Sequence, residues 1–359
     1  MHVIDHLGYG GAPVAVKNIV ENLDRDRFEA IVCALRTNPR ALPLASKLVN
    51  LGQHKYNPFA FLAIARLCKE HRIDIIHAHL QKSVVSCLLS GLFCDAKIII
   101  HEHGPIFRGG TGVIYRLLLK ALSPRAAAAI ANSEATRDAL IRTARLDEAS
   151  VFTVGNFIDF ERFNCTRYDR DKARETLGIE ADRTVVGFVG RLDSCKGVDV
   201  LIDAAAILCP EDERYHFVIV GEGAQRRQLE AMVARLGLGE AVTFTGLCEN
   251  PAEIIRAFDL AVVPSRREAF GIAAVEFMRM KVSVIASAVG GLTEVIRHEQ
   301  TGILLEELSA GHIAEAVRRL LRESPLRERL IDEAEAFSRK FDGQEQLRQI
   351  ADIYEKLSP

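Results

Sequence analysis

The sequence predicts an α/β fold built of two doubly wound domains, each a parallel sheet with helices on both faces. Short apolar runs of strand length alternate with helical segments along most of the 359 residues, as is typical of parallel sheets. The alternation stops at a polar segment, residues 161–182, and then starts again. The length suits two domains of ordinary size. We therefore expect domains at residues 1–160 and 161–340, with ligands bound beyond the carboxyl ends of the strands and in a cleft between the domains.

The first domain is expected to alternate strands with helices. The strands are expected at residues 2–7, 28–34, 74–77, 97–101, 126–131 and 151–154. The helices are expected at residues 14–23, 41–51, 59–71, 81–91, 112–124 and 135–144. Asn132-Ser133-Glu134 is a good N-terminal cap for the last of these helices.

The second domain is expected to repeat the pattern. Its strands are expected at residues 184–189, 216–220, 242–245, 260–263, 283–287 and 302–305. Its helices are expected at residues 198–209, 224–236, 251–258, 272–278, 310–322 and 325–340, and a last helix at about 342–357.

Composition narrows the class of protein. Formal net charge is −2, so bulk charge gives no reason to expect nucleic-acid binding. Residues 1–160 hold 19 Lys and Arg against 14 Asp and Glu, an excess that favours an acidic partner or an anionic membrane surface as much as ordinary surface variation. The eight cysteines form no C-x-x-C pair and are typical of a reducing compartment. No apolar stretch reaches the length of a membrane span, so we expect a cytoplasmic protein, either free or peripheral to a membrane.

The strongest chemical pattern lies at residues 265–276. A polar turn follows the apolar strand at 260–263 and leads into a helix; Glu268 lies in the turn and Glu276 about two turns into the helix. A helix N-terminus has free backbone N–H groups and a partial positive charge, which suit an anion. Because the carboxylates would repel an anion, we expect them to bind hydroxyl groups on either side of it. A diphosphate flanked by two polyols, as in a nucleotide sugar, fits this pattern.

Two other turns that contain glycine follow strands. Arg191 and Lys196 lie five residues apart in the loop after the strand at 184–189, and a planar guanidinium with a mobile ammonium suits a diphosphate. Alone, this loop is equally typical of solvated basic residues. Gly10 and Gly11 lie between a strand and a helix, which permits close approach of backbone to phosphate, but their spacing differs from the G-x-G-x-x-G fingerprint.

Taken together, Glu268-x7-Glu276, the Arg191–Lys196 loop and Gly290-Gly291-Leu292-Thr293-Glu294 resemble the family 4 glycosyltransferases. These are retaining nucleotide-sugar enzymes with the GT-B fold, two Rossmann-like domains facing across a cleft. The resemblance covers nearly the whole chain and is densest at residues 184–306. It implies an acceptor-side domain at 1–160, a donor-binding domain at 161–340 and a C-terminal helix at 341–359 that packs back on the first domain.

The resemblance also implies a role for each site residue. Arg191 and Lys196 would bind the donor diphosphate and stabilise the leaving group, while Glu276 would bind the ribose and Glu268 the transferred sugar. Further donor contacts are expected from backbone N–H groups near Phe270, Gly271 and Ile272, from Gly10 and Gly11, from His103 beside the sugar, and from Leu247 with Cys248 at the base. The sequence departs from the family at Lys281 and Ser283, where a Gly and a Pro are usual, and at Phe157, where a Gly usually follows Asn156.

The family is described by a front-face route in which the departing phosphate oxygen takes the acceptor's proton. The alternative, a carboxylate nucleophile, finds no clear residue in the first domain. No cofactor and no metal are expected, because no D-x-D motif ends a strand. His77-x-His79 and His101-x-His103 fit a zinc site, but histidines at strand ends more often serve as hydrogen-bonding residues.

The acceptor is expected to be a saccharide or a lipid-linked saccharide, as in surface-polysaccharide or glycolipid assembly. Arg116 and Lys120 share one face of the helix at 112–124, opposite leucines, so this helix fits an anionic membrane surface; a core helix with one wet face remains open. The favoured function is retaining transfer from a nucleoside-diphosphate sugar, UDP-sugar first, to an acceptor hydroxyl. The alternatives are a nucleotide-sugar 2-epimerase of the same fold and a non-catalytic subunit that binds nucleotide sugars.

Overall fold

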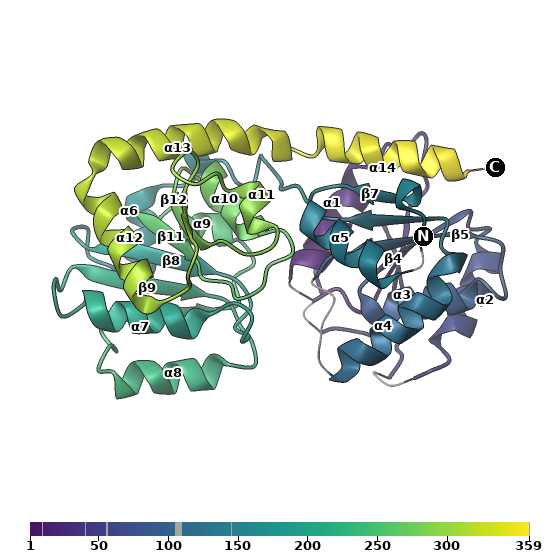
Figure 1. Cartoon of the computed structure of the whole chain (residues 1–359), viewed down its shortest axis with the longest axis horizontal. Helices are drawn as coiled ribbons and strands as arrows, with labels where there is room; N and C mark the ends of the chain where they lie inside the picture. Colours follow the sequence, from purple (N-terminus) through teal and green to yellow (C-terminus); the bar gives the residue numbers. More distant parts are fainter. Residues whose placement is uncertain (9, 40, 55–56, 105–109, 145, 359) are drawn as a thin grey trace. The chain divides into compact units, whose positions relative to one another are not determined.

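A computed structural model describes residues 1–358 apart from 9, 40, 55–56, 105–109 and 145. The chain divides into two compact units: unit 1 comprises Met1–Phe157 with Gly343–Pro359, and unit 2 comprises Ile158–Asp342. Each unit is a parallel sheet with helices on both faces (Figure 1), which confirms the predicted fold class. The chain passes from unit 1 to unit 2 after Phe157 and returns after Asp342.

The described part of unit 1 forms a seven-stranded parallel sheet in the order β3-β2-β1-β4-β5-β6-β7. Its strands are β1 (His2–Ile4), β2 (Ile31–Ala34), β3 (Lys47–Asn50), β4 (Ile75–His79), β5 (Lys97–Glu102), β6 (Ala128–Ala131) and β7 (Val151–Thr153). The order reverses between β1 and β4, so loops on opposite sides of this point diverge, as in other doubly wound sheets.

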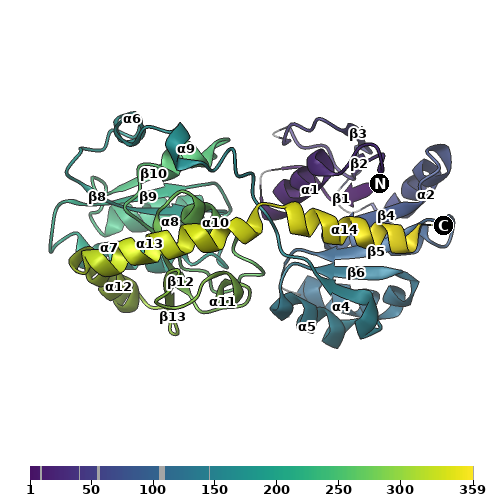
Figure 2. The same ribbon diagram turned by 90° about the horizontal axis from the view of Figure 1, so that it is seen from above.

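Helices cover both faces of this sheet (Figure 2). They are α1 (Gly11–Asn22), α2 (Ala60–Glu70), α3 (Gln81–Ser90), α4 (Gly110–Leu122), α5 (Glu134–Thr143) and α14 (Gln344–Leu357), with one-turn 3₁₀ helices at Ser123–Arg125 and Glu148–Ser150. Apolar residues of α2, α3, α4 and α5 pack in one core cluster with the strands. On the opposite face, α1 and α14 pack over the sheet, with Ile350 and Tyr354 of α14 in the core. Thus α14, late in the chain, completes unit 1.

The helix predicted at residues 41–51 is wrong. Residues 41–46 are irregular, and Lys47–Asn50 form the edge strand β3, paired in parallel with β2. The backbone N–H of Leu42 donates to the carbonyl of Leu7 at 2.8 Å. Pairing with β2, a contact between distant segments, therefore outweighs the local helical spacing of the leucines, and Pro43 supplies no N–H for a helix.

The described part of unit 2 is a six-stranded parallel sheet in the order β10-β9-β8-β11-β12-β13. Its strands are β8 (Thr184–Val189), β9 (Tyr215–Val220), β10 (Val242–Gly246), β11 (Leu260–Val263), β12 (Ser283–Ser287) and β13 (Ile303–Leu305). β8, β11 and β12 have the limits predicted from the sequence. The order reverses between β8 and β11.

Two core clusters fill the two faces of this sheet. Helices α7 (Val198–Leu208), α8 (Arg226–Arg235) and α12 (Ala310–Arg322) pack on one face. The other face is covered by α6 (Arg170–Thr176), α9 (Pro251–Ile255), α10 (Ile272–Arg279), α11 (Leu292–Val295) and α13 (Ser324–Ser338). One-turn 3₁₀ helices lie at Cys165–Arg167 and Arg339–Phe341.

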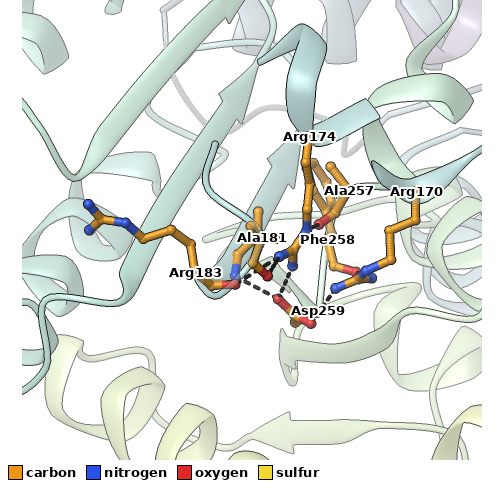
Figure 3. A network of polar contacts seen from close by, with 8 residues as sticks. Arg170, Arg174, Ala181, Arg183, Ala257, Phe258 and Asp259 are labelled. Atoms are coloured by element: carbon orange, nitrogen blue, oxygen red, sulfur yellow. Dashed lines mark hydrogen bonds and ion pairs between the residues drawn. The ribbon is translucent and has the colours of Figure 1, made fainter. Parts of the chain in front are cut away.

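The polar segment at 161–182 contains α6, which the sequence analysis missed, and α6 is anchored to the sheet by a buried arginine (Figure 3). Arg174 is only 5% exposed. It donates to Oδ2 of Asp259 at 2.7 Å and to three backbone carbonyls, those of Ala181, Arg183 and Ala257. Asp259 also accepts from Arg170 at 2.5 Å and from the backbone N–H of Val185 at 2.8 Å. This network joins α6 to the starts of β8 and β11.

None of the described helices is both long and apolar enough to span a bilayer. All eight cysteines are free thiols. Burial raises the pKa of Cys33 and Cys68 to about 12, so these thiols serve as apolar core side chains.

We predict that Asp259→Ala lowers the free energy of unfolding of unit 2 by about 3 kcal/mol, because it leaves the buried guanidinium of Arg174 without its carboxylate. Urea unfolding of the full chain, with hydrogen exchange of β8 peptides, measures this loss. The control is Asp212→Ala, which removes the exposed pair with Arg214 and should leave unfolding unchanged. Equal effects of the two substitutions would contradict the prediction.

Candidate functional site

The loops after β8 and β11 lie at the point where the strand order of unit 2 reverses, the usual ligand-binding position in a doubly wound sheet. The two loops contact each other through their backbones. Gly197 has a φ of 65°, and a Cβ added to it would lie 2.0 Å from the carbonyl oxygen of Pro264. The backbone N–H of Arg266 donates to the carbonyl of Cys195 at 2.7 Å. A side chain at position 197 would therefore separate the two loops.

A third loop, after β12, supports the turn that carries Glu268. Gly290 has a φ of 51°, and a Cβ there would lie 2.0 Å from the carbonyl oxygen of Glu268. The N–H of Gly291 donates to that same oxygen at 3.2 Å. The hydroxyl of Ser287 donates to the carbonyl of Ser265. The turn is thus held by hydrogen bonds from a neighbouring strand and loop.

Lys196 and Glu268, predicted separately from two loops, are brought into direct contact. Nζ of Lys196 lies 2.5 Å from Oε2 of Glu268, and the hydroxyl of Ser265 donates to the same oxygen at 3.1 Å. Both charged side chains are mostly buried, at 21% and 14% exposed. Arg191 lies apart from this pair: its side chain is 64% exposed and bonds to Asp193 at 3.0 Å. The pair can bind an anion and a hydroxyl group side by side.

Helix α10 begins directly after this turn. Gly271 precedes it with a φ of 97°, and a Cβ there would lie 2.5 Å from Cδ2 of Leu292. Ile272 is the first helical residue, where backbone N–H groups lack helical partners. Phe270 packs in the core against Phe341, with ring centroids 5.7 Å apart, so only its backbone is expected to reach a ligand.

Glu276 lies in α10, but closer to its start than predicted. The helix begins at Ile272, so this residue lies about one turn in, not two. Its side chain is buried, and burial raises its pKa to about 8, opposed by the charge of Arg162. Groups that donate hydrogen bonds to the carboxylate of Glu276 would stabilise its ionised form and offset the effect of burial.

Leu247 follows β10 and is 36% exposed, and Cys248 beside it is half-buried. Lys281, where the family usually has glycine, has a φ of 58° and so takes the left-handed conformation that glycine favours. This departure therefore keeps the backbone shape of the turn. Phe157, where the family usually has glycine, lies close to Gly343 in unit 1: a Cβ on Gly343 would lie 2.5 Å from the ring of Phe157.

In unit 1, Gly10 and Gly11 begin α1 at the carboxyl end of β1, where a Cβ on Gly11 would meet no atom within 4 Å. Tyr9, within the predicted glycine turn, lies outside the described residues. His103 follows β5, and its Nε2 lies 2.8 Å from Nδ1 of His79.

His103 is half-buried and stacks at the end of a group of five histidines on one face of the sheet. The other four, His2, His77, His79 and His101, are buried. Parallel pairing sets His2 beside His77 and His79 beside His101, so the rings project from the same face. Burial lowers the pKa of each histidine well below 6.5, to about 3 for His103. All five are therefore neutral at pH 7.

Two overlapping groups of three histidines have ligand atoms within 4.8 Å of one another, which suits a metal ion. Among the described residues, however, their ring nitrogens pair with one another at 2.8–3.0 Å. Distances of this kind are hydrogen bonds. The described rings thus hydrogen-bond to one another, while the expectation that no metal binds here stays a prediction.

The sequence analysis missed several residues that hold the site together. Ser265 and Ser287 are small polar residues at strand ends, and that position is the only local signal of their role. His2 and Tyr354 contact the other histidines, but no motif marks them. Arg162 lies outside every predicted motif and acts on Glu276 only through its charge.

Family models match both halves of the chain. Residues 169–337 match a model described as "Glycosyl transferases group 1", and residues 9–162 match one described as "Glycosyltransferase Family 4". Together the two matches include every predicted site residue.

Curated relatives are similar over part of their length. The chain is 33% identical over 238 residues to an alpha-D-kanosaminyltransferase of Streptomyces kanamyceticus, covering 65% of this chain and 61% of the relative. It is 37% identical over 203 residues to D-inositol 3-phosphate glycosyltransferase 1 of Catenulispora acidiphila, covering 54% and 48%. The chain thus spans about half to three-fifths of the curated relatives it matches.

Solved structures share the fold over nearly the whole chain. HepE of Anabaena, in complex with UDP-glucose, has a TM-score of 0.84 at 24% identity, with 99% of this chain and 98% of HepE covered. Sucrose-phosphate synthase of Thermosynechococcus elongatus has a TM-score of 0.86 at 21% identity, with 99% and 98% covered.

We predict that acid destabilises unit 1 more than unit 2. Below pH 6.5 these five histidines bind protons in the unfolded chain but stay neutral in folded unit 1. The free energy of unfolding therefore falls by up to about 1.4 kcal/mol per histidine and pH unit. Glu102, whose pKa burial raises to about 7, opposes this by one proton. In unit 2, the lowered pKa of His216 and the raised pKa of Glu276 act in opposite directions.

Hydrogen exchange of the full chain at pH 7.5 and 5.5, corrected for intrinsic rates, measures this difference. Peptides of β4 and β5 should lose protection at pH 5.5, while those of β8 and β11 keep theirs as the internal control. Unchanged protection of β4 and β5 would show that the histidines are not held neutral.

Proposed function

We propose a function for this chain from one premise: the chain belongs to the family 4 glycosyltransferases. It transfers a sugar from a nucleoside-diphosphate sugar to an acceptor hydroxyl, with retention of the anomeric configuration. The observation that carries this proposal is the contact between Lys196 and Glu268 at the carboxyl edge of unit 2. A cation and a carboxylate side by side fit the point where a phosphate joins a sugar.

Lys196 and Glu268 bind different parts of the donor. Lys196 neutralises charge on the diphosphate and stabilises it further as the sugar departs, and Arg191, exposed in the same loop, adds a second cation. Glu268 accepts hydrogen bonds from sugar hydroxyls. The backbone N–H groups at Gly271 and Ile272 meet the phosphate at the start of α10.

Glu276 binds the ribose in this proposal. A diol that donates two hydrogen bonds stabilises the carboxylate form, which compensates for the burial that holds its pKa at about 8. Leu247 and Cys248, beyond β10, line the base pocket. In unit 1, Gly10 and Gly11 contact the phosphate side and His103 the transferred sugar.

Retention proceeds by the front-face route. A double displacement would require a carboxylate nucleophile beside the sugar. Glu102 is the carboxyl next to His103 in sequence, but successive residues of a strand project from opposite faces. Its Oε2 accepts from Tyr115 of α4 at 3.0 Å, in the core below the sheet. The departing phosphate oxygen therefore takes the acceptor's proton, and no metal or cofactor is required.

UDP is the favoured nucleotide, because HepE, which shares the fold, binds UDP-glucose. The proposed pathway is surface-polysaccharide or glycolipid assembly; another structure with the same fold, WaaG, is described as involved in lipopolysaccharide biosynthesis. The proposed compartment is the cytoplasm, in keeping with eight free thiols.

Helix α4 supports a lipid-linked acceptor and a peripheral location at the membrane. Tyr115 and Leu119 point into the core, whereas four apolar side chains of the same helix are 40–64% exposed: Val113, Ile114, Leu117 and Leu118. Arg116 and Lys120 are exposed on the same helix. A core helix with a wet face would expose polar residues instead, so this surface favours the anionic bilayer.

The two alternative functions find less support. A 2-epimerase needs further acid and base carboxylates near His103, and Glu102 projects from the other face. A non-catalytic binding subunit does not require Lys196 and Glu268 to be held together.

We predict that Lys196→Ala and Glu276→Ala each abolish donor binding, because they remove the diphosphate cation and the ribose acceptor. A thermal-shift screen with UDP-, GDP- and ADP-sugars identifies the donor, since a ligand of the native state raises Tm, and isothermal calorimetry then gives Kd. The control is Arg235→Ala, an exposed charge at the far end of α8. Normal binding by either site variant would place the donor elsewhere.

We also predict that Arg116→Glu with Lys120→Glu weakens binding to phosphatidylglycerol vesicles at least tenfold at low salt, at about 1 kcal/mol per charge. Vesicle co-sedimentation measures this. Arg66→Glu with Lys69→Glu on α2, the same change in net charge, should bind as the unchanged chain does. If the unchanged chain binds no vesicles, the membrane part of the proposal fails.

A further inference from the structure

Two cationic side chains lie at the carboxyl edge of unit 1, apart from the residues assigned to the donor. Arg36 follows β2, Asp5 directly follows β1, and Lys82 lies in the first turn of α3, after β4. β1 lies between β2 and β4, pairs in parallel with both, and ends in register with them. Neighbouring strands are about 4.8 Å apart, so the long side chains of Arg36 and Lys82 can reach one group held beyond the end of β1.

The guanidinium of Arg36 is not explained by the fold. Arg36 is half-buried, and its Nε is enclosed without a hydrogen-bond partner among the residues that the structure describes. The carboxylate on the neighbouring strand, Asp5, is used elsewhere: its Oδ1 accepts from the backbone N–H and the hydroxyl of Ser83 in α3, at 2.8 and 2.6 Å. A guanidinium stays charged, and a charge that loses water without gaining a partner costs free energy.

Lys82 lies within electrostatic reach of both Asp5 and Arg36. Its Nζ donates to the carbonyl of His54 at 3.3 Å. Burial lowers the pKa of Lys82; the charge of Asp5 opposes this shift, and the charge of Arg36 adds to it. The ammonium and the guanidinium are thus close enough to repel each other, and a single carboxylate does not balance both. A bound anion would stabilise the charged form of each cation.

A phosphate group suits these two cations better than a carboxylate does. The guanidinium offers N–H donors in a planar fork, and the ammonium is a mobile point charge. The two oxygens of a carboxylate are satisfied by the fork alone. A tetrahedral phosphate has further oxygens, which can accept from Lys82 on the side opposite Arg36.

We propose that Arg36 and Lys82 form a phosphate subsite in unit 1, and that the acceptor is a phosphorylated molecule held there. The role of the acceptor rests on the proposed function, in which the donor diphosphate lies on Lys196 of unit 2. The binding of phosphate to unit 1 does not depend on that function. A sugar phosphate and the diphosphate of a lipid-linked saccharide share this chemistry.

Calorimetric titration of the full chain, saturated with UDP to fill the donor site, measures the subsite. The probes are inorganic phosphate, glucose 1-phosphate and hexyl diphosphate, with glucuronate as a carboxylate. Arg36→Gln and Lys82→Gln should each raise the Kd of the phosphates at least about tenfold, because each removes charge-assisted hydrogen bonds. Arg36→Lys keeps the charge without the fork and should recover part of the affinity.

Arg72→Gln and Lys97→Gln are the matched controls. They remove the same charges at the opposite, amino edge of the sheet, where Arg72 precedes β4 and Lys97 begins β5, both exposed. Both controls should bind phosphate as the unchanged chain does. An equal loss in the controls, no phosphate binding by the unchanged chain, or tighter binding of glucuronate than of the phosphates would overturn the proposal.

Thermal unfolding without ligand separates a binding role of Arg36 from a structural one. Arg36→Met removes the charge and keeps an apolar side chain in place of the stem. Because the guanidinium costs free energy in the folded chain, Tm should not fall. A lower Tm would show that Arg36 stabilises the fold, contrary to the proposal.

The UDP site supplies a further test. If Arg36→Gln weakens UDP binding as much as phosphate binding, Arg36 belongs to the donor site and the phosphate subsite is wrong. If UDP does not bind the unchanged chain, the proposed function fails, and titration of Lys196→Ala with phosphate still tests the subsite. Tighter binding of hexyl diphosphate supports a lipid-linked acceptor, and tighter binding of glucose 1-phosphate supports a soluble sugar phosphate.

Discussion

The candidate site of unit 2 depends on close contact between backbones at the carboxyl edge of one parallel sheet. Gly197 touches the carbonyl of Pro264, and Gly290 touches that of Glu268. These contacts leave no room for a Cβ, so they set the loops after β8, β11 and β12 at one separation. Lys196 then reaches Glu268 without any motif that links the two in sequence. The contact between Lys196 and Glu268 thus depends on Gly197 and Gly290, which set the positions of the loops. Neither charged residue determines where its own loop lies.

The fold and most of the candidate site could be predicted from local patterns. β8, β11 and β12 are largely apolar runs bounded by polar, glycine or proline residues, and a fully buried strand leaves that signature. Glu268 and Glu276 could be found because a turn and a helix start follow such a strand directly. Local patterns fail at residues 41–51, because pairing with β2 decides the structure there. Arg174 was missed for a similar reason: its acceptors lie in two separate segments, residues 181–183 and 257–259.

The histidines show the same limit in a different form. The H-x-H spacing alone predicts that two rings lie on one face of each strand. It does not state that His79 lies beside His101, because the register between strands is set by the whole sheet. Nor does it indicate Tyr354, which meets His77 from 277 residues away. Neutral rings in a row are a property of the assembled unit, and each residue alone predicts only a buried polar group.

The return of the chain to unit 1 has a consequence for biosynthesis. Unit 2 is one continuous segment, Ile158–Asp342, whereas the core of unit 1 includes Ile350 and Tyr354 of α14. At about 5–20 residues per second, a ribosome takes ~10–40 s to make unit 2 after the first segment of unit 1 has emerged. During this interval the sheet face that α14 later covers has no partner from its own chain. Unit 2 can therefore complete its folding before unit 1. The nascent segment Met1–Phe157 is the part that needs protection by a chaperone.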